Sequence, residues 1–145
     1  MTKFNPIFGF AGQASQAMDL YAKAFDAKIT TKLTYAQANP KDFTCNTGEE
    51  NLIYYAEIKI GKQLISMGDD FEAVRGGVQP NTGNAFRIDL LVHFDTDEAL
   101  KTAHDLLAEG GTVLTPLCSQ TYCSLTSAVV DKYGGRWQLM SGYKG

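Results

Sequence analysis

The stretch FNPIFGFAGQASQAMDLYAKAFDA, residues 4–27, decides the fold of this chain. In its first seven residues one set alternates with another, Phe4, Pro6, Phe8 and Phe10 with Asn5, Ile7 and Gly9. This is the period of a β-strand with one face on a core. Apolar residues then recur every three or four positions from Ala14 to Phe25, and this spacing predicts an amphipathic helix that ends at about Asp26. A strand is therefore followed closely by a helix.

Three more strands are predicted after this helix. Residues 28–36 read as a strand, and residues 37–50 carry the proline, asparagine and glycine of a loop. Residues 52–60 alternate between an apolar face and a face that carries Tyr55, Glu57 and Lys59, and Gly61–Lys62 predicts a hairpin turn into a last strand at 63–67. The first part of the chain thus has the order βαβββ.

The same order recurs in the second part of the chain. Residues 86–94 alternate as a strand, and Asp95 is expected to cap a helix, with Glu98 completing the capping box. The helix should end at Gly110–Gly111. We expect His104 on this helix to be exposed. Strands are predicted at 112–115, 124–131 and 136–140.

Landmarks of the two parts can be superimposed. The helix ends Asp26 and Gly110 are 84 residues apart, and the closing-strand residues Met67 and Met140 are 73 apart. The first part then carries a longer loop, which fits 37–50. We therefore predict an α+β fold of two βαβββ modules in one domain spanning 1–145. Its halves are about 4–68 and 85–141, joined by a linker rich in Gly, Pro and Asn at 69–84. The alternative is a coincidental α+β order.

Composition excludes several classes of function. The formal net charge is −3 and no run of Lys or Arg occurs, which argues against a nucleic-acid partner. No apolar stretch reaches the ~20 residues of a membrane span, and no signal peptide is evident, so we expect a cytoplasmic protein. The three cysteines, Cys45, Cys118 and Cys123, are expected to be free thiols.

Four blocks of sequence resemble a known family. They are Gln13–Ala27 (QASQAMDLYAKAFDA), Tyr55–Ile58 (YAEI), Glu109–Val113 (EGGTV) and Asp131–Trp137 (DKYGGRW). In this order they resemble the PhnB-like, or 3-demethylubiquinone methyltransferase-like, branch of the glyoxalase/bleomycin-resistance/dioxygenase (vicinal oxygen chelate) superfamily. The resemblance implies an eight-stranded, partly open barrel, commonly dimeric, with a small-molecule ligand in the concave sheet. A homodimer is therefore expected.

In metal-dependent relatives, His, Gln or Glu residues of the first and last strands of each module hold a divalent ion. By the two offsets, the corresponding positions here are Asn5, Ile65, Asp89 and Gln138. One carboxylate and no imidazole make a poor ligand set for such an ion. We therefore expect neither a catalytic metal nor another cofactor.

The strand face opposite the helices should line the ligand cavity. The residues that we expect to contact the ligand are Tyr55, Glu57, Arg87, Asp89, Tyr122 and Gln138. The tyrosines can offer a hydroxyl and an apolar ring, although either can equally be structural filling. Arg87 and Asp89 inside a barrel would imply a polar ligand, whereas at a wet barrel mouth they would pair with each other or with Glu57. His93 is a candidate general base.

Two main functions follow from these patterns. The first is a binding protein that holds a small molecule without a catalytic metal. The alternative is a metal-dependent or acid/base enzyme of the same superfamily, an isomerase, lyase or dioxygenase-like catalyst. A third reading is a dimeric module that only mediates assembly.

Overall fold

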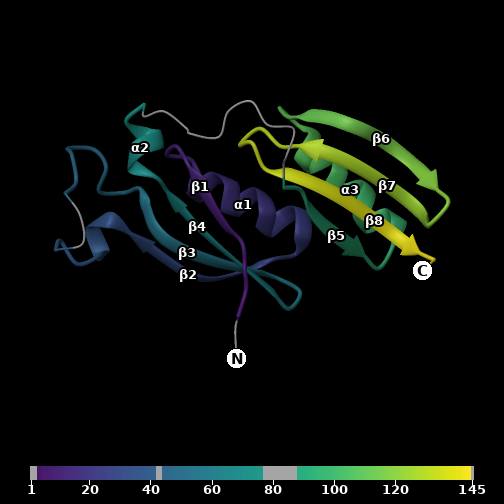
Figure 1. Cartoon of the computed structure of the whole chain (residues 1–145), viewed down its shortest axis with the longest axis horizontal. Coiled ribbons are helices and arrows are strands. Elements are labelled where there is room, and N and C mark those ends of the chain that lie inside the picture. Colours follow the sequence, from purple (N-terminus) through teal and green to yellow (C-terminus); the bar gives the residue numbers. More distant parts are fainter. Residues whose placement is uncertain (1–2, 42–43, 77–87, 145) are drawn as a thin grey trace. The chain divides into compact units, whose positions relative to one another are not determined.

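A computed structural model of the chain describes residues 3–41, 44–76 and 88–144. The chain forms two compact units, Met1–Thr82 and Gly83–Gly145. Each unit combines one long helix with a four-stranded sheet in the order βαβββ (Figure 1).

The first unit contains β1, α1 and β2–β4, followed by a short helix. Its elements are β1 (Ile7–Phe10), α1 (Ala14–Phe25), β2 (Lys28–Thr34), a 3-10 turn at Tyr35–Gln37, β3 (Ile53–Ile60), β4 (Gln63–Asp69) and α2 (Phe71–Val74). The strand order is β1-β4-β3-β2, with β1 parallel to β4 and the other pairs antiparallel.

The second unit repeats this plan. Its elements are β5 (Leu90–Phe94), α3 (Asp97–Ala108), β6 (Thr112–Gln120), β7 (Cys123–Val130) and β8 (Arg136–Tyr143). The strand order is β5-β8-β7-β6, and β5 runs parallel to β8. The α+β fold of two βαβββ modules is thereby confirmed. Each four-stranded sheet has two edge strands, so neither is itself a closed barrel.

In the first unit, α1 covers one face of the sheet. Met18 and Tyr21 of α1 are fully buried, as are Ile58 of β3 and Met67 of β4. The ring of Phe8 meets that of Tyr21 edge-on, with centroids 6.3 Å apart. Even-numbered residues of β1 and β3 therefore face the helix, and the odd-numbered ones point away from it.

The end of α1 has an unusual cap. Asp26 adopts a left-handed conformation with φ 51°, and it is the one described non-glycine residue with positive φ. Its backbone N–H bonds to the carbonyl of Ala22 and so closes the helix. Glycine tolerates this conformation at lower cost, and Asp is among the residues that adopt it most readily otherwise.

In the second unit, α3 packs on β7 and β8. Leu100 and Leu107 of α3 are fully buried, as are Leu139 and, at 1% exposure, Trp137 of β8. Ser141 of β8 donates to Asp97 of α3 over 2.6 Å. Odd-numbered residues of β8 therefore face the helix.

Two predictions about α3 are wrong. Its N-cap is Thr96 instead of Asp95, because the Thr96 hydroxyl accepts from the Ala99 N–H at 3.1 Å. His104 is buried, with only 8% of its surface exposed. It lies one turn after Leu100 on the packed stripe, and its Nδ1 is 2.9 Å from the Ser127 hydroxyl. That hydroxyl satisfies the ring, so a histidine can occupy a core position.

Other boundaries differ more modestly. Within the described residues, β1 begins at Ile7 and β5 begins at Leu90, so both are shorter than predicted. β6 is longer and runs to Gln120. The predicted linker 69–84 begins inside β4 and contains α2, and its remainder from 77 lies outside the described residues.

The cysteines have the state that the sequence predicts. All three cysteines are free thiols, and Cys123 is buried. Over the described part of the chain, no helix combines the length and the apolar character that crossing a membrane would require.

Candidate functional site

On each sheet, the face turned away from the long helix, here called the helix-distal face, carries a cluster of bonded polar side chains. In the first unit the cluster has five members, which are Asn5, Thr31, Tyr55, Glu57 and Ser66. The strand registers align Ser66 of β4 with Glu57 of β3, and Glu57 with Thr31 of β2. We call this set the Glu57 cluster.

Hydrogen bonds link the Glu57 cluster from edge to edge. The Tyr55 hydroxyl donates to Oε2 of Glu57 over 2.7 Å and lies 3.0 Å from Oγ of Ser66. Nδ2 of Asn5 donates to the same Oγ over 3.0 Å, and Thr31 donates to Oε1 of Glu57 over 3.2 Å. The cluster therefore centres on one carboxylate that is held in place by neutral hydroxyls. A carboxylate oxygen can accept more than one hydrogen bond, so Glu57 retains capacity for an additional donor.

In the second unit the helix-distal face carries the Asp89 cluster, made of Asp89, Arg136 and Gln138. Nε of Arg136 donates to Oδ1 of Asp89 over 2.6 Å, and Nε2 of Gln138 donates to Oδ2 over 3.2 Å. The Arg136 and Asp89 side chains are 30% and 15% exposed. The charge of Asp89 is thus neutralised by a cation at the sheet surface, and this shielded ion pair is stronger than one in open water.

The two clusters occupy equivalent places in the repeat. The register aligns Ile7 with Ser66 in the first sheet and Leu91 with Gln138 in the second. The counterpart of Gln138 is therefore Ser66, and the sequence-based assignment to Ile65 is wrong by one residue. Ile65 is 2% exposed and lies on the helix side. In both units a residue just N-terminal to the first strand, two positions before the aligned Ile7 or Leu91, bonds to this counterpart position, as Asn5 to Ser66 and Asp89 to Gln138.

These residues fit a divalent metal poorly. The side chain of Asn5 donates its amide N–H to Ser66, and Asp89 accepts from an arginine, which competes directly with a cation. Over the described residues, no group of three or more His, Cys, Asp or Glu side chains is arranged to hold a metal.

The structure brings Tyr55 together with Glu57, and Asp89 with Gln138. Tyr122 lies in the β6–β7 turn and is 48% exposed. Arg87 lies outside the described residues. The expectation that the six predicted residues surround one cavity stays a prediction.

Arg136 is the member of the Asp89 cluster that the sequence analysis did not single out, as Thr31 and Ser66 are in the Glu57 cluster. It precedes Trp137 and Gln138 in the DKYGGRW block, and alternation along β8 puts it on the same face as Gln138. Alternation along β8 could therefore have indicated the face of Arg136. It could not have indicated the partner Asp89, which is 47 residues away in the sequence. His93 is exposed on β5, with its ring 6.0 Å from the ring of Tyr143 and nearly perpendicular to it.

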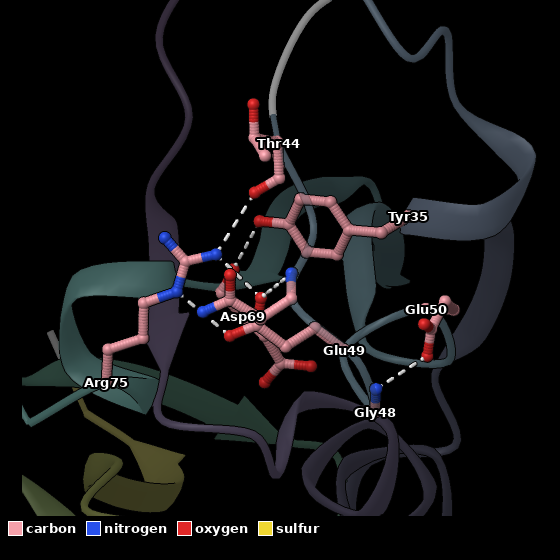
Figure 2. Close-up of polar contacts among 8 residues, drawn as sticks. Tyr35, Thr44, Gly48, Glu49, Glu50, Asp69 and Arg75 are labelled. Carbon is pink, nitrogen blue, oxygen red and sulfur yellow. Dashed lines mark hydrogen bonds and ion pairs between the residues drawn. The ribbon is translucent and has the colours of Figure 1, made fainter.

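A second polar cluster in the first unit fastens the long loop between β2 and β3 (Figure 2). Arg75 binds both carboxylate oxygens of Glu49, at 3.0 and 2.6 Å, and donates to the carbonyl of Thr44 at 3.1 Å. Its guanidinium lies 4.3 Å from the centroid of the Phe71 ring. That ring stacks on Tyr35 at 4.1 Å. We read this loop clamp as structural.

Electrostatics agree with this reading. The hydrogen bond from Arg75 holds the pKa of Glu49 below the ordinary glutamate range, and the same bond raises the pKa of Arg75. Burial, followed by the nearby charge of Asp69, raises the pKa of the Tyr35 hydroxyl. That hydroxyl donates to the backbone carbonyl of Asp69 over 2.8 Å. Glu49 and Tyr35 are therefore held in their ordinary ionisation states near neutral pH.

Known structures share the whole fold. A PhnB protein from Bacillus cereus matches with a TM-score of 0.76 and 27% identity, covering 97% of this chain and 100% of that one. A glyoxylase/bleomycin resistance protein/dioxygenase domain from Frankia sp. matches with a TM-score of 0.61 and 13% identity, over 100% and 95%. The fosfomycin resistance protein FosX from Mesorhizobium loti matches with a TM-score of 0.57 and 8% identity, over 98% and 93%.

The last two likenesses concern the fold alone. Comparison with protein-family models found no match, and comparison with curated proteins found none. The PhnB-like resemblance deduced from the four sequence blocks is nonetheless confirmed by the Bacillus cereus structure.

Proposed function

We propose that this chain, a member of the glyoxalase/bleomycin-resistance superfamily, binds a small polar molecule on its helix-distal sheet faces without a catalytic metal. The observation that carries the proposal is the pair of partly buried polar clusters centred on the carboxylates of Glu57 and Asp89. Burying charged and hydroxyl groups on a sheet face is costly unless they are bonded. Apolar residues would cover such a face at lower cost if packing were its sole role.

The chemistry of the Glu57 cluster favours a ligand with hydrogen-bond donors. Glu57 presents a carboxylate, while the hydroxyls of Tyr55 and Ser66 can each donate or accept. The ring of Tyr55 adds apolar contact area. A cationic or N–H-bearing small molecule matches this set, because its donors would complete the acceptor capacity of the carboxylate.

A fragment screen by protein NMR tests the proposal. Amidines, amines and carboxylates of similar size are titrated into the labelled chain, and backbone amide shifts are mapped onto the two sheets. We expect donor-bearing fragments to shift amides of the Glu57 cluster. The Glu57→Gln variant should lose that response, while the control Glu109→Gln, an exposed residue after α3, should retain it. A response confined to other surfaces would contradict the proposal.

The alternative function is an acid/base enzyme. The observation in its favour is the 2.7 Å hydrogen bond from Tyr55 to Glu57, which sets a proton donor and an acceptor side by side. Elemental analysis and thermal shifts with Ni²⁺, Co²⁺, Mn²⁺, Zn²⁺ and Fe²⁺ separate a metal-dependent version from metal-free binding. Stabilisation of the fold by one bound ion per chain would count against the binding proposal as stated.

The expected homodimer belongs to the same proposal. Its support is the resemblance to the PhnB-like branch. Light scattering coupled to size exclusion should give twice the mass of one chain. A monomer at micromolar concentration would remove the homodimer from the proposal without affecting the ligand site within each unit.

A further inference from the structure

Gly9 occupies a position on β1 at which none of the described residues requires a glycine. Its φ lies outside the left-handed region, and a Cβ built there would meet no atom within 4 Å. Glycine in a strand weakens the strand and frequently marks a close approach by a ligand or another backbone. Gly61 and Gly134 have equally open surroundings, but both adopt positive φ and are needed for their turns.

The neighbour of Gly9 across the sheet is also a glycine. The register pairs Gly9 with Gly68 of β4. Gly68 has a local reason, since its Cβ would lie 2.9 Å from the carbonyl oxygen of Tyr54. Gly9 therefore leaves bare backbone on β1, whereas the backbone of Tyr54 occupies the side-chain position of Gly68. The bare backbone lies on the helix-distal face, because Phe8 and Met67 face α1.

The second unit fills the equivalent place. The register that pairs Gly9 with Gly68 pairs His93 with Met140 in the other sheet. Duplication of the fold therefore does not account for the two glycines. The two units also differ at a neighbouring position of the same face. The first unit has Glu57 there, and by the same registers the second unit has Ala128.

Side chains that border the bare backbone define what would fit on it. Ile7, 70% exposed, precedes it on β1, and Ser66 precedes Gly68 on β4. The antiparallel register pairs Glu57 with Ser66 and Ala56 with Met67, so its continuation places Tyr55 of β3 beside Gly68 of β4. The Tyr55 hydroxyl turns back to Glu57 and Ser66. An apolar edge, an aromatic ring and a carboxylate thus adjoin two residues that have no side chains.

We propose that Gly9 determines ligand specificity by letting a planar ring lie flat on the backbone of β1. A cationic N–H donor of the ring substituent would then be directed to Glu57. The inference rests on the proposed function and names its ligand class, a planar aromatic or conjugated cation. A flat ring needs the close approach that a side chain at position 9 would block. Ile7 and Tyr55 supply its apolar contacts.

Three fragments test the ring and the charge separately. Benzamidine has both the planar ring and the amidinium, cyclohexanecarboxamidine has the cation on a puckered ring, and benzoate has the ring with the opposite charge. Backbone amide shifts are followed in NMR titrations. Benzamidine should shift the amides of Gly9 and Gly68 and bind most tightly, with a dissociation constant of about millimolar for so small a molecule. Benzoate should not shift them.

The decisive variant is Gly9→Leu, which fills the bare backbone. The open surroundings and ordinary φ of Gly9 mean that this variant should fold and retain its thermal midpoint. Benzamidine affinity should fall by about tenfold or more because the ring is displaced. Lys62→Leu, which adds the same side chain at the exposed β3–β4 turn, should bind like the parent chain.

Each other outcome is informative. Benzamidine shifts on Thr31 or Leu33 but not on Gly9 would overturn the role of Gly9 and leave the proposed function standing. No shift on the helix-distal face with any fragment would overturn both. A change of molecular mass in Gly9→Leu, seen by light scattering, would assign the bare backbone to a protein contact and overturn the ligand assignment.

Discussion

Tyr55 donates its hydroxyl to the carboxylate of Glu57 over 2.7 Å, from two positions earlier on the same strand. Residues two apart on a strand share a face, so alternation alone makes this contact possible. The partner that fixes it comes from β4, where Ser66 lies 3.0 Å from the same hydroxyl and is 5% exposed. The contact therefore joins local periodicity to sheet pairing.

The Tyr55→Phe variant tests the stabilising part of that contact. It removes one hydroxyl and two hydrogen bonds while keeping the ring. We expect a loss of about 1–3 kcal/mol in the free energy of unfolding, because each such bond usually contributes about 0.5–1.5 kcal/mol net. Urea denaturation measures the change. Tyr143→Phe, at a residue 61% exposed, serves as the control and should be neutral.

The ion pair between Asp89 and Arg136 should stabilise the second unit. A double-mutant cycle with Asp89→Asn and Arg136→Gln isolates its coupling energy from other effects of each change. We expect a coupling of about 1–3 kcal/mol, because the bond is charge-assisted and partly shielded from water. A coupling near zero would reduce the pair to an ordinary surface contact.

Among the described side chains of the first unit, we expect the carboxylate of Asp69 to make the largest polar contribution to the free energy of unfolding. Its Oδ1 accepts from the backbone N–H groups of Gly12 and Ala14, and its Oδ2 accepts from that of Ile53. Asp69→Ala would leave three donors without their acceptor, each at a cost of about 1–3 kcal/mol. We expect at least about 3 kcal/mol of destabilisation in urea, against about 0.5 kcal/mol or less for the exposed Asp19→Ala.

The loop clamp should weaken in acid. The pKa of Glu49 is lowered in the folded chain, chiefly by the hydrogen bond from Arg75. Its ionised carboxylate therefore adds stability above the unfolded glutamate pKa of about 4.3, and this contribution is lost as pH falls through the lower folded value. Glu49→Gln should lower the urea midpoint at about pH 7 and do so much less at about pH 3.

Asp97 gives an independent comparison for the acid experiment. Hydrogen bonds from Ser141 and Ser124 lower its pKa in the folded chain. The contribution of the Asp97 carboxylate to stability should likewise be lost as the pH falls. The urea midpoint of Asp97→Asn should therefore differ most from that of the parent chain near neutral pH. An equal effect of either variant at both pH values would contradict the linkage for that residue.

The sequence by itself determined the order of elements, the internal duplication and the resemblance to PhnB-like proteins. Alternation and the helical repeat are local patterns. Each gathers the apolar residues of a segment on one face, and that face is the one that becomes buried. For this reason β3, α1 and the turn at Gly61–Lys62 were predicted within a few residues. The face that carries Tyr55 and Glu57 followed from the same alternation.

The tertiary structure alone decided which polar groups bond to each other. Arg136 reaches Asp89 across 47 residues of sequence, and Arg75 reaches Glu49 across 26. His104 is buried because Ser127 of another element meets its ring. Such pairings depend on strand register, and a one-residue shift in register moves a side chain to the other face of the sheet. The counterpart of Gln138 shows this, because it is Ser66 on the helix-distal face and not the predicted Ile65 on the helix side. Periodicity fixes the face that a side chain occupies, whereas only the paired backbone fixes its partner.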